Sequence, residues 1–338
     1  MDIKKVTLCW IVLAFTGHIY AQTMQSEFLF EKAPFAACHA STIIDCKGDL
    51  LAAWFGGTHE KHKDVGIWIS KKSNGKWSDP IEVVNGIQHT DKRYPTWNPV
   101  LMRRTPDRII LFYKVGPSPS TWWGEMVTSM DCGESWGSPC RLPEDILGPV
   151  KNKAVILRDG TLLCPSSTEH DGWKVQVELS KNWGMDWQLI GPLKADGDIQ
   201  AIQPTVLQHP NGHLQMLCRT KKSGIAEAWS DDQGLTWTLL KQSTLPNPNS
   251  GIDGVTTSSG EHYLVYNPTS TPAGKWGGER YPLVLAKSSD GVEWQEVVTL
   301  ESEPGEYSYP AIIQGEDGDL HITYTWKRDR IKHVVIDL

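Results

Sequence analysis

One pattern of two β-rich runs joined by a tight turn recurs six times along the chain. The copies are spaced by roughly 50 residues, and each turn carries glycine or aspartate, which supply the backbone freedom that a reversal needs. The turns centre on Gly48, Asp107, Gly160, Gly212, Gly260 and Gly318. A period of this length with two hairpins per unit is typical of propeller blades. The repeat therefore predicts an all-β fold, a six-bladed β-propeller.

A second repeat falls between the copies of the first. The pattern Ser-x-Asp-x-Gly-x-Ser/Thr-Trp, the Asp-box, ends at Trp136 and Trp237, a shortened copy ends at Trp294, and degenerate copies end at Trp187 and Trp77. Its aspartate can accept hydrogen bonds from the amides of its own turn, and its tryptophan can plug a blade. We therefore predict that these tryptophans are structural and do not bind a sugar.

The last copy of the hairpin supplies about three strands, so its blade lacks one. The segment Glu27–Glu31 precedes the first hairpin, and we predict that it closes the ring as the missing strand. Such closure leaves no open sheet edge. Because no linker or low-complexity tract interrupts the repeats, we expect residues 22–338 to form a single domain.

The first 21 residues have the order of a secretory signal peptide: two lysines, an apolar run over residues 6–15, and Ala21 before the expected cleavage. The run is too short for a permanent membrane anchor. We expect an exported monomer, periplasmic or extracellular. The formal net charge of -7 gives no electrostatic case for binding nucleic acid or an anionic membrane.

All cysteines except Cys9 follow the expected cleavage site, and none has the spacing of a zinc site. In an exported protein they can oxidise, which makes Cys38 with Cys46 and Cys132 with Cys140 candidate bridges. The alternative is that they are small buried apolar side chains. We expect neither a metal nor a cofactor.

In its Asp-boxes and its six hairpin repeats, the chain resembles the Asp-box sialidases. It resembles more closely the sialidase-like proteins of plants and bacteria with unassigned substrates. The resemblance covers nearly the whole chain after residue 21. It implies a funnel in which three arginines bind the substrate carboxylate, a geometry that suits guanidinium groups. Arg219, after HLQMLC, and Arg280, in ERYPLVLAKSSD, match two of them. His39 stands where the first arginine is expected.

The resemblance also implies a tyrosine nucleophile. Tyr307, in the Tyr-Ser segment that opens the last repeat, matches it. Gln203 stands where the family has a glutamate that takes the proton of the tyrosine, and glutamine cannot take one. Either Glu306, Asp253 or Glu169 supports the tyrosine instead, or the chemistry differs.

The general acid of the family is an aspartate on a loop of the first blade. Asp64, before the run Val-Gly-Ile-Trp, matches that position, with Glu60 and His62 as alternatives. The loop before it, residues 56–63, is polar and begins with two glycines, as a lid would. Capping of a turn is the other interpretation of Asp64.

Six further residues lie at predicted blade entrances, where they would face the funnel and bind substrate. Aromatic faces beside polar groups suit sugar rings, and basic residues suit an acidic one. They are Trp54, Arg93, Asn98, Lys153, Asp253 and Tyr309.

These residues lead to a first hypothesis, an exo-acting glycoside hydrolase that removes a terminal acidic sugar from an oligosaccharide or glycoconjugate. Asp64 would be the acid and Tyr307 the nucleophile, with the arginines and His39 holding the carboxylate. A lyase that cleaves uronates by β-elimination is the second hypothesis. A carbohydrate-binding propeller without catalysis is the third, and the missing glutamate favours it.

Overall fold

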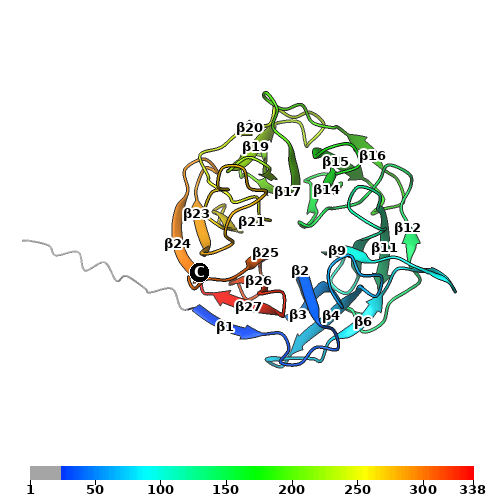
Figure 1. Cartoon of the computed structure of the whole chain (residues 1–338). Coiled ribbons are helices and arrows are strands. Elements are labelled where there is room, and N and C mark those ends of the chain that lie inside the picture. The colour runs from blue at the N-terminus through cyan, green and yellow to red at the C-terminus, as the bar shows by residue number, and fades with distance from the viewer. Residues whose placement is uncertain (1–23) are drawn as a thin grey trace, which may run out of the picture.

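The computed structural model describes residues 24–338, which form a ring of six antiparallel sheets around a central axis (Figure 1). The region that the inner strands of the six blades surround is called the funnel. The predicted all-β propeller is confirmed, and residues 24–338 contain no helix. Within these residues no helix is long and apolar enough to cross a membrane. The predicted signal peptide, residues 1–21, lies outside the described residues.

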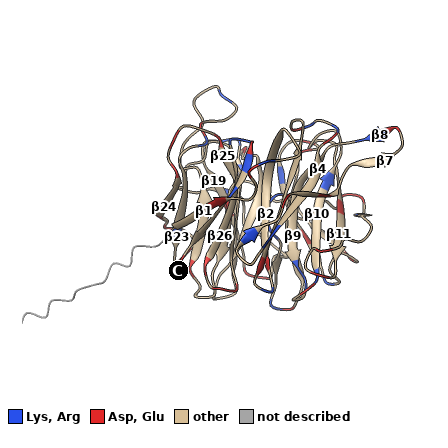
Figure 2. Cartoon of the chain, turned by 90° about the horizontal axis from the view of Figure 1, so that it is seen from below, with Lys and Arg blue, Asp and Glu red and all other residues tan. Residues whose placement is uncertain are grey.

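The first three blades run from β2 to β16. Blade 1 contains β2 (Ala37–Cys46), β3 (Asp49–Gly57), β4 (Gly66–Ser73) and β5 (Lys76–Trp77), with β6 (Ile81–Val84) also pairing with β4. Blade 2 contains β9 (Thr96–Arg103), β10 (Ile109–Val115), β11 (Trp123–Ser129) and β12 (Cys140–Arg141). Blade 3 contains β13 (Val155–Ile156), β14 (Leu162–Thr168), β15 (Lys174–Ser180) and β16 (Gln188–Ile190). Between blades 1 and 2, β7 (Ile87–His89) and β8 (Lys92–Arg93) form a hairpin that projects from the ring (Figure 2).

The remaining blades complete the ring. Blade 4 contains β17 (Ala201–Gln208), β18 (Leu214–Thr220), β19 (Ile225–Ser230) and β20 (Lys241–Gln242). Blade 5 contains β21 (Asp253–Thr256), β22 (His262–Tyr266), β23 (Leu283–Ser288) and β24 (Gln295–Glu301). Blade 6 contains β25 (Tyr307–Gln314), β26 (Leu320–Trp326), β27 (Arg330–Ile336) and β1 (Met24–Phe28).

Closure of the ring by the N-terminal strand is confirmed. β1 pairs antiparallel with β27 from Met24 opposite Ile336 to Phe28 opposite Lys332. The strand begins three residues before the predicted segment Glu27–Glu31. Glu27 anchors it, because its Oε1 accepts hydrogen bonds from His333 Nδ1 at 3.0 Å, Lys72 Nζ at 2.6 Å and Trp77 Nε1 at 3.0 Å.

We expect this anchor to weaken in acid. The hydrogen bond from His333, followed by the contacts with Lys72 and Trp77, lowers the pKa of Glu27 to about 2 against burial, which raises it. A depressed carboxyl pKa contributes stability that is present above pH 4.5 and is lost as the pH falls toward 2. We expect Glu27→Gln to have a lower Tm than wild type at neutral pH. Its Tm should fall less than that of wild type as the pH is lowered across this range, which thermal unfolding measures. Glu31→Gln is the control, because Glu31 is exposed and its one ion pair within residues 24–338 is with Arg330. Identical curves of Tm against pH for Glu27→Gln and wild type would contradict the role of Glu27 as an anchor of the closing strand.

The Asp-boxes close their own turns, as predicted. Asp131, Asp232 and Asp290 accept hydrogen bonds from amides of their own turns at 2.8 to 2.9 Å. All five box tryptophans pack on the apolar clusters between neighbouring blades, namely Trp77, Trp136, Trp187, Trp237 and Trp294. The hydrophobic core is thus divided among the blade interfaces, which holds the ring rigid around the funnel.

The cysteine pairing differs from both predicted bridges. Cys46 at the end of β2 is bonded to Cys132 in the Asp-box turn of blade 2. Cys38 lies at the other end of β2, roughly 25 Å from Cys46 along an extended strand, so those two cannot bridge. Cys140 is free and exposed, while Cys38, Cys164 and Cys218 are free and buried. The alternative of small buried side chains therefore holds for these last three.

Candidate functional site in the central funnel

The inner strands bend where they meet the funnel. In four blades one residue with positive φ interrupts the inner strand, and in blade 3 such a residue lies four positions before it: Ala40, Asn98, Gln203 and Tyr309, and Lys151 before β13, with φ between 39° and 72°. Four of them coincide with a shift of register against the next strand. Non-glycine residues rarely adopt this conformation, and such strain collects at functional sites. The bulges turn these side chains out of the blades.

Tyr309 lies at the centre of the resulting cluster. Its Oη accepts hydrogen bonds from Arg219 Nη1 at 2.8 Å and from Gln203 Nε2 at 3.1 Å. The imidazole of His39 packs against its ring, with 4.1 Å between centroids. A Cβ on Gly251 would come within 3.3 Å of the tyrosine ring, so the glycine leaves room for it. The predicted substrate-binding residue Tyr309 is therefore the best-positioned phenol of the funnel.

Tyr307, the predicted nucleophile, lies elsewhere. It is 1% exposed and belongs to the apolar cluster between blades 5 and 6, with its ring near Trp326. Burial raises the pKa of its phenol, and Glu301 and Glu303 add to the shift. The structure does not bring it together with Arg219, Gln203 or His39, so the candidate nucleophile becomes Tyr309. The bulge at Tyr309 explains the difference, because it rotates that side chain away from the direction of Tyr307.

Gln203 contacts the tyrosine as the family pattern implies, but in a fixed orientation. Its Oε1 accepts from Arg219 Nη1 at 3.1 Å, which leaves its Nε2 to donate to Tyr309. Its backbone is held by Ser167 Oγ, which accepts from its amide at 3.0 Å. Neither the amide nor the guanidinium on the phenol oxygen can take a proton from it.

The two predicted arginines differ in their contacts. Arg219 is buried, donates from Nε to Asn249 Oδ1 at 2.8 Å and holds the tyrosine. Arg280 donates from Nη1 to Glu306 Oε1 at 2.8 Å. Burial is the main cause that lowers the pKa of Arg280, with Arg219 next. Both guanidinium groups therefore belong to one cationic region.

A third arginine, Arg328, was missed by the sequence reasoning. It lies in the turn between β26 and β27, donates from Nε to both oxygens of Glu306 at 3.1 and 3.0 Å, and from Nη1 to Glu60 at 2.7 Å. Lys327 and Arg328 have φ of 52° and 60°, although such turns favour glycine or asparagine. The basic pair in this turn was the available signal.

His39 is buried and neutral at pH 7. Burial, followed by the charges of Arg328, Arg280 and Arg219, holds its pKa well below the usual value. Its Nδ1 lies 2.9 Å from Thr325 Oγ1. His39 thus takes its predicted place in the funnel without contributing a positive charge.

Asp64 does not have the environment of a general acid. Its carboxylate accepts from the amide and hydroxyl of Thr58 at 3.0 and 2.6 Å and lies 2.7 Å from His62 Nδ1. Although burial opposes them, these contacts lower its pKa to about 2, so it is ionised at neutral pH. The capping interpretation fits this geometry, and the carboxylate ties the ends of the loop over residues 58–64 together. Arg93 supports the same loop by donating to the carbonyl oxygen of Asp64 at 2.7 Å.

The other predicted substrate-binding residues are mostly structural. Trp54 is fully buried against Phe30 and is not available to substrate. Lys153 pairs with Asp253 at 2.8 Å, and Asp253 also accepts from Thr205 Oγ1 and the amide of Ile312. These bonds link blades 3, 4, 5 and 6 to one another. Asn98 is 5% exposed at the bulge of blade 2.

Two titratable groups beside the cluster have shifted pKa values. Burial lowers the pKa of Lys151 to about 7, and its Nζ donates to the carbonyl oxygens of Ile252 and Pro310. Burial raises the pKa of Glu169, whose Oε2 accepts from Trp173 Nε1 at 2.8 Å. The guanidinium of Arg219 lies 5.2 Å from the Trp173 ring, which places Glu169 at the edge of the cluster.

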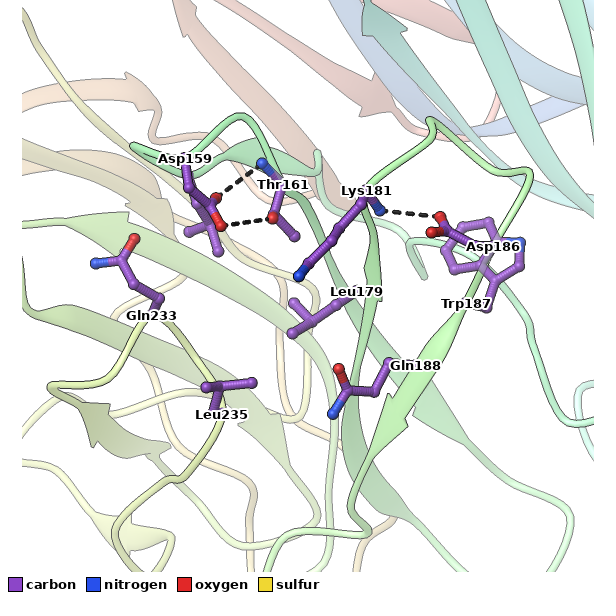
Figure 3. Close-up of a pocket in the computed structure, with 10 residues that line it drawn as sticks. Asp159, Thr161, Leu179, Lys181, Asp186, Trp187, Gln188, Gln233 and Leu235 are labelled. Carbon is purple, nitrogen blue, oxygen red and sulfur yellow. Dashed lines mark hydrogen bonds between the residues drawn. The ribbon is translucent and has the colours of Figure 1, made fainter.

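A cavity outside the funnel lies between blades 3 and 4, beside the Asp-box of blade 3 (Figure 3). Asp159 there is engaged by the amide and hydroxyl of Thr161, both at 2.9 Å, and Asp186 accepts from the amide of Lys181 at 3.0 Å. Its carboxylates thus stabilise local turns. Among residues 24–338 no three His, Cys, Asp or Glu side chains are arranged to hold a metal ion.

The fold and the funnel define a six-bladed propeller of the Asp-box class. Residues 48–322 match the model of the BNR repeat-like domain, and the chain belongs to that family. A search of curated proteins finds no match.

Solved structures share the fold at low sequence identity. A protein of unknown function from Dyadobacter fermentans superposes with a TM-score of 0.76 at 15% identity, over 95% of this chain and 100% of its own. Trypanosoma rangeli sialidase superposes with a TM-score of 0.73 at 14% identity, over 92% of this chain and 59% of its own. A mutant NanB sialidase from Streptococcus pneumoniae superposes with a TM-score of 0.70 at 13% identity, over 89% of this chain and 68% of its own. The chain thus spans little more than half the length of the trypanosomal enzyme.

Proposed function

We propose that this protein is an exo-acting glycoside hydrolase that removes a terminal acidic sugar from a glycan. The observation that carries the proposal is the phenol of Tyr309, held by Arg219 and Gln203 in a funnel with three arginines. A cationic, largely buried cluster favours an anionic ligand. The likeness to proteins named as sialidases supports the same class of substrate.

In the proposed mechanism the oxygen of Tyr309 attacks the anomeric carbon and its proton passes to the neutral imidazole of His39 beside it, while the glycosidic oxygen is protonated and leaves. Glu169 replaces Asp64 as the candidate acid, because burial raises its pKa whereas that of Asp64 is about 2. Arg219, Arg280 and Arg328 hold the acid group, and water completes the cleavage. We further propose that the protein is exported as a monomer and meets its glycan outside the cytoplasm.

The test is incubation of the wild-type protein with a panel of sialyl-, glucuronosyl- and galacturonosyl-terminated oligosaccharides and their neutral counterparts. We expect one acidic class to lose its terminal sugar, with products whose summed mass exceeds the substrate by one water. The neutral oligosaccharides serve as controls. Binding of an acidic glycan in calorimetry without product over long incubation would contradict hydrolysis and support a carbohydrate-binding propeller.

A lyase is the second candidate, and one observation favours it. Arg219 and Gln203 both donate hydrogen bonds to Tyr309 Oη, and His39 beside it is neutral and could accept a proton. Abstraction of the proton next to a uronate carboxylate, followed by loss of the glycosidic oxygen, would give an unsaturated sugar. In the same panel this outcome appears as new ultraviolet absorbance and products without added water.

A further inference from the structure

Arg328 stands beside the position where the family pattern expects the arginine that His39 replaces. Its carbonyl oxygen accepts from the amide of Cys38 at 2.8 Å, so the turn of blade 6 is fixed against the first strand of blade 1. The amide of Lys327 donates to the carbonyl oxygen of Glu306 at 2.8 Å, which fixes the turn from the other side. A cavity of about 190 Å³ is lined by Arg328, His39, Phe55 and Glu60 among others.

The two carboxylates on Arg328 are held very differently. Glu306 also binds Arg280 at 2.8 Å and Ser308 Oγ at 3.2 Å, and these partners lower its pKa although burial raises it. Glu60 belongs to the loop over residues 58–64, and its carboxylate has one ion pair among the described residues, to Arg328 Nη1. Glu306 is therefore a fixed partner, and Glu60 is the one that can leave.

We propose that Arg328 is a specificity-determining residue for acidic sugars and that Glu60 occupies the place of the substrate carboxylate until substrate binds. The inference rests on the proposed function for the acidic nature of the ligand. The side chains of Arg328 and Glu60 are 32% and 35% exposed, and an ion pair that solvent reaches contributes little net free energy, so an incoming carboxylate can replace Glu60. Arg280 and Arg328 are the arginines that pair with Glu306 and Glu60, so departure of Glu60 leaves two guanidinium groups with one carboxylate between them.

The loop is built to move as a unit. Asp64 ties its end to Thr58 through two hydrogen bonds and lies against His62, so the segment between them is closed on itself. Gly56 and Gly57 precede it at the end of β3. Release of Glu60 would then shift the loop away from the cavity beside His39 without unfolding it.

Calorimetric titration of the full chain with D-glucuronate and N-acetylneuraminate, and with D-glucose as neutral probe, tests the inference. Glu60→Gln should bind one of the acids about 3- to 5-fold more tightly than wild type, since a competing carboxylate is gone. Arg328→Met should weaken the same acid by about 10-fold or more. Arg330→Met is the matched control from the same hairpin, because Arg330 pairs with Glu31 and stacks on Phe28 instead, and it should leave affinity unchanged.

Unchanged or weaker acid binding in Glu60→Gln would overturn the inference, as would absence of acid binding in both wild type and Glu60→Gln. Equal loss of acid and glucose binding in Arg328→Met would do the same. Thermal unfolding checks that Arg328→Met is folded. Glu60→Gln tests the competition for Arg328 even if Arg328→Met does not fold, because Glu60 lies in a surface loop. The readout is binding, so a chain that binds acids in this way but cleaves nothing in the panel refutes the hydrolase alone.

Discussion

Replacement of Tyr309 by phenylalanine is expected to lower the turnover of an accepted glycan on the order of 10³-fold, within the range of a lost catalytic proton or nucleophile. The ring, its contact with His39 and the space beside Gly251 are retained, so only the oxygen bound by Arg219 and Gln203 is removed. The measurement is the initial rate on the active member of the oligosaccharide panel, with near-wild-type unfolding temperature as the check on folding.

Tyr307→Phe is the matched control. Tyr307 is two residues away on the same strand and buried in the core between blades 5 and 6. Because its ring packs in this apolar cluster and not beside Arg219, Gln203 and His39, we expect turnover within a few-fold of wild type. Loss of activity in Tyr307→Phe with unchanged turnover in Tyr309→Phe would restore the assignment made from the Tyr-Ser segment and refute the one made from the funnel.

Removal of the bond between Cys46 and Cys132 is expected to have the largest effect on stability. The bond joins blades 1 and 2 and closes a loop with a sequence separation of 86 residues. In the chain-entropy model a loop of this size contributes about 4.6 kcal/mol, because the cross-link restricts the unfolded chain. Thermal and denaturant unfolding of the double variant Cys46→Ser and Cys132→Ser should show this loss.

Cys140→Ser is the control for the disulfide, since Cys140 is exposed and free. We expect it to unfold like wild type. Addition of a reducing agent should lower the stability of the wild type and of Cys140→Ser. It should leave the stability of the double variant unchanged. A double variant as stable as wild type under oxidising conditions would show that the bond does not form in solution.

The fold could be predicted from the sequence because the information is local and repeated. Each hairpin turn and each Asp-box can be recognised within about ten residues, and six copies leave few alternatives to a closed ring. The closing strand followed from counting strands, and β1 pairs with β27 as that count required. The chemistry of the tryptophans and aspartates in the boxes is equally local.

The site could be predicted only in part, because its members meet through bulges and ring closure. Tyr307 and Tyr309 would point the same way in a regular strand, and only the bulge separates core from funnel. Asp64 matched a position, but its partners Thr58 and His62 decide that it is a capping carboxylate with a low pKa. Neither effect leaves a signal in residue spacing.

By itself the sequence determined the propeller, its boxes, its closure and the presence of Arg219, Arg280, His39 and Gln203 near the funnel. The tertiary structure alone decided which tyrosine they surround, which cysteines pair, and that Arg328 joins them. The physical reason is distance along the chain: Arg328 reaches Cys38 and Glu60 only because blade 6 closes against blade 1. Contacts of that kind are set by the ring as a whole, and no segment of the sequence contains them.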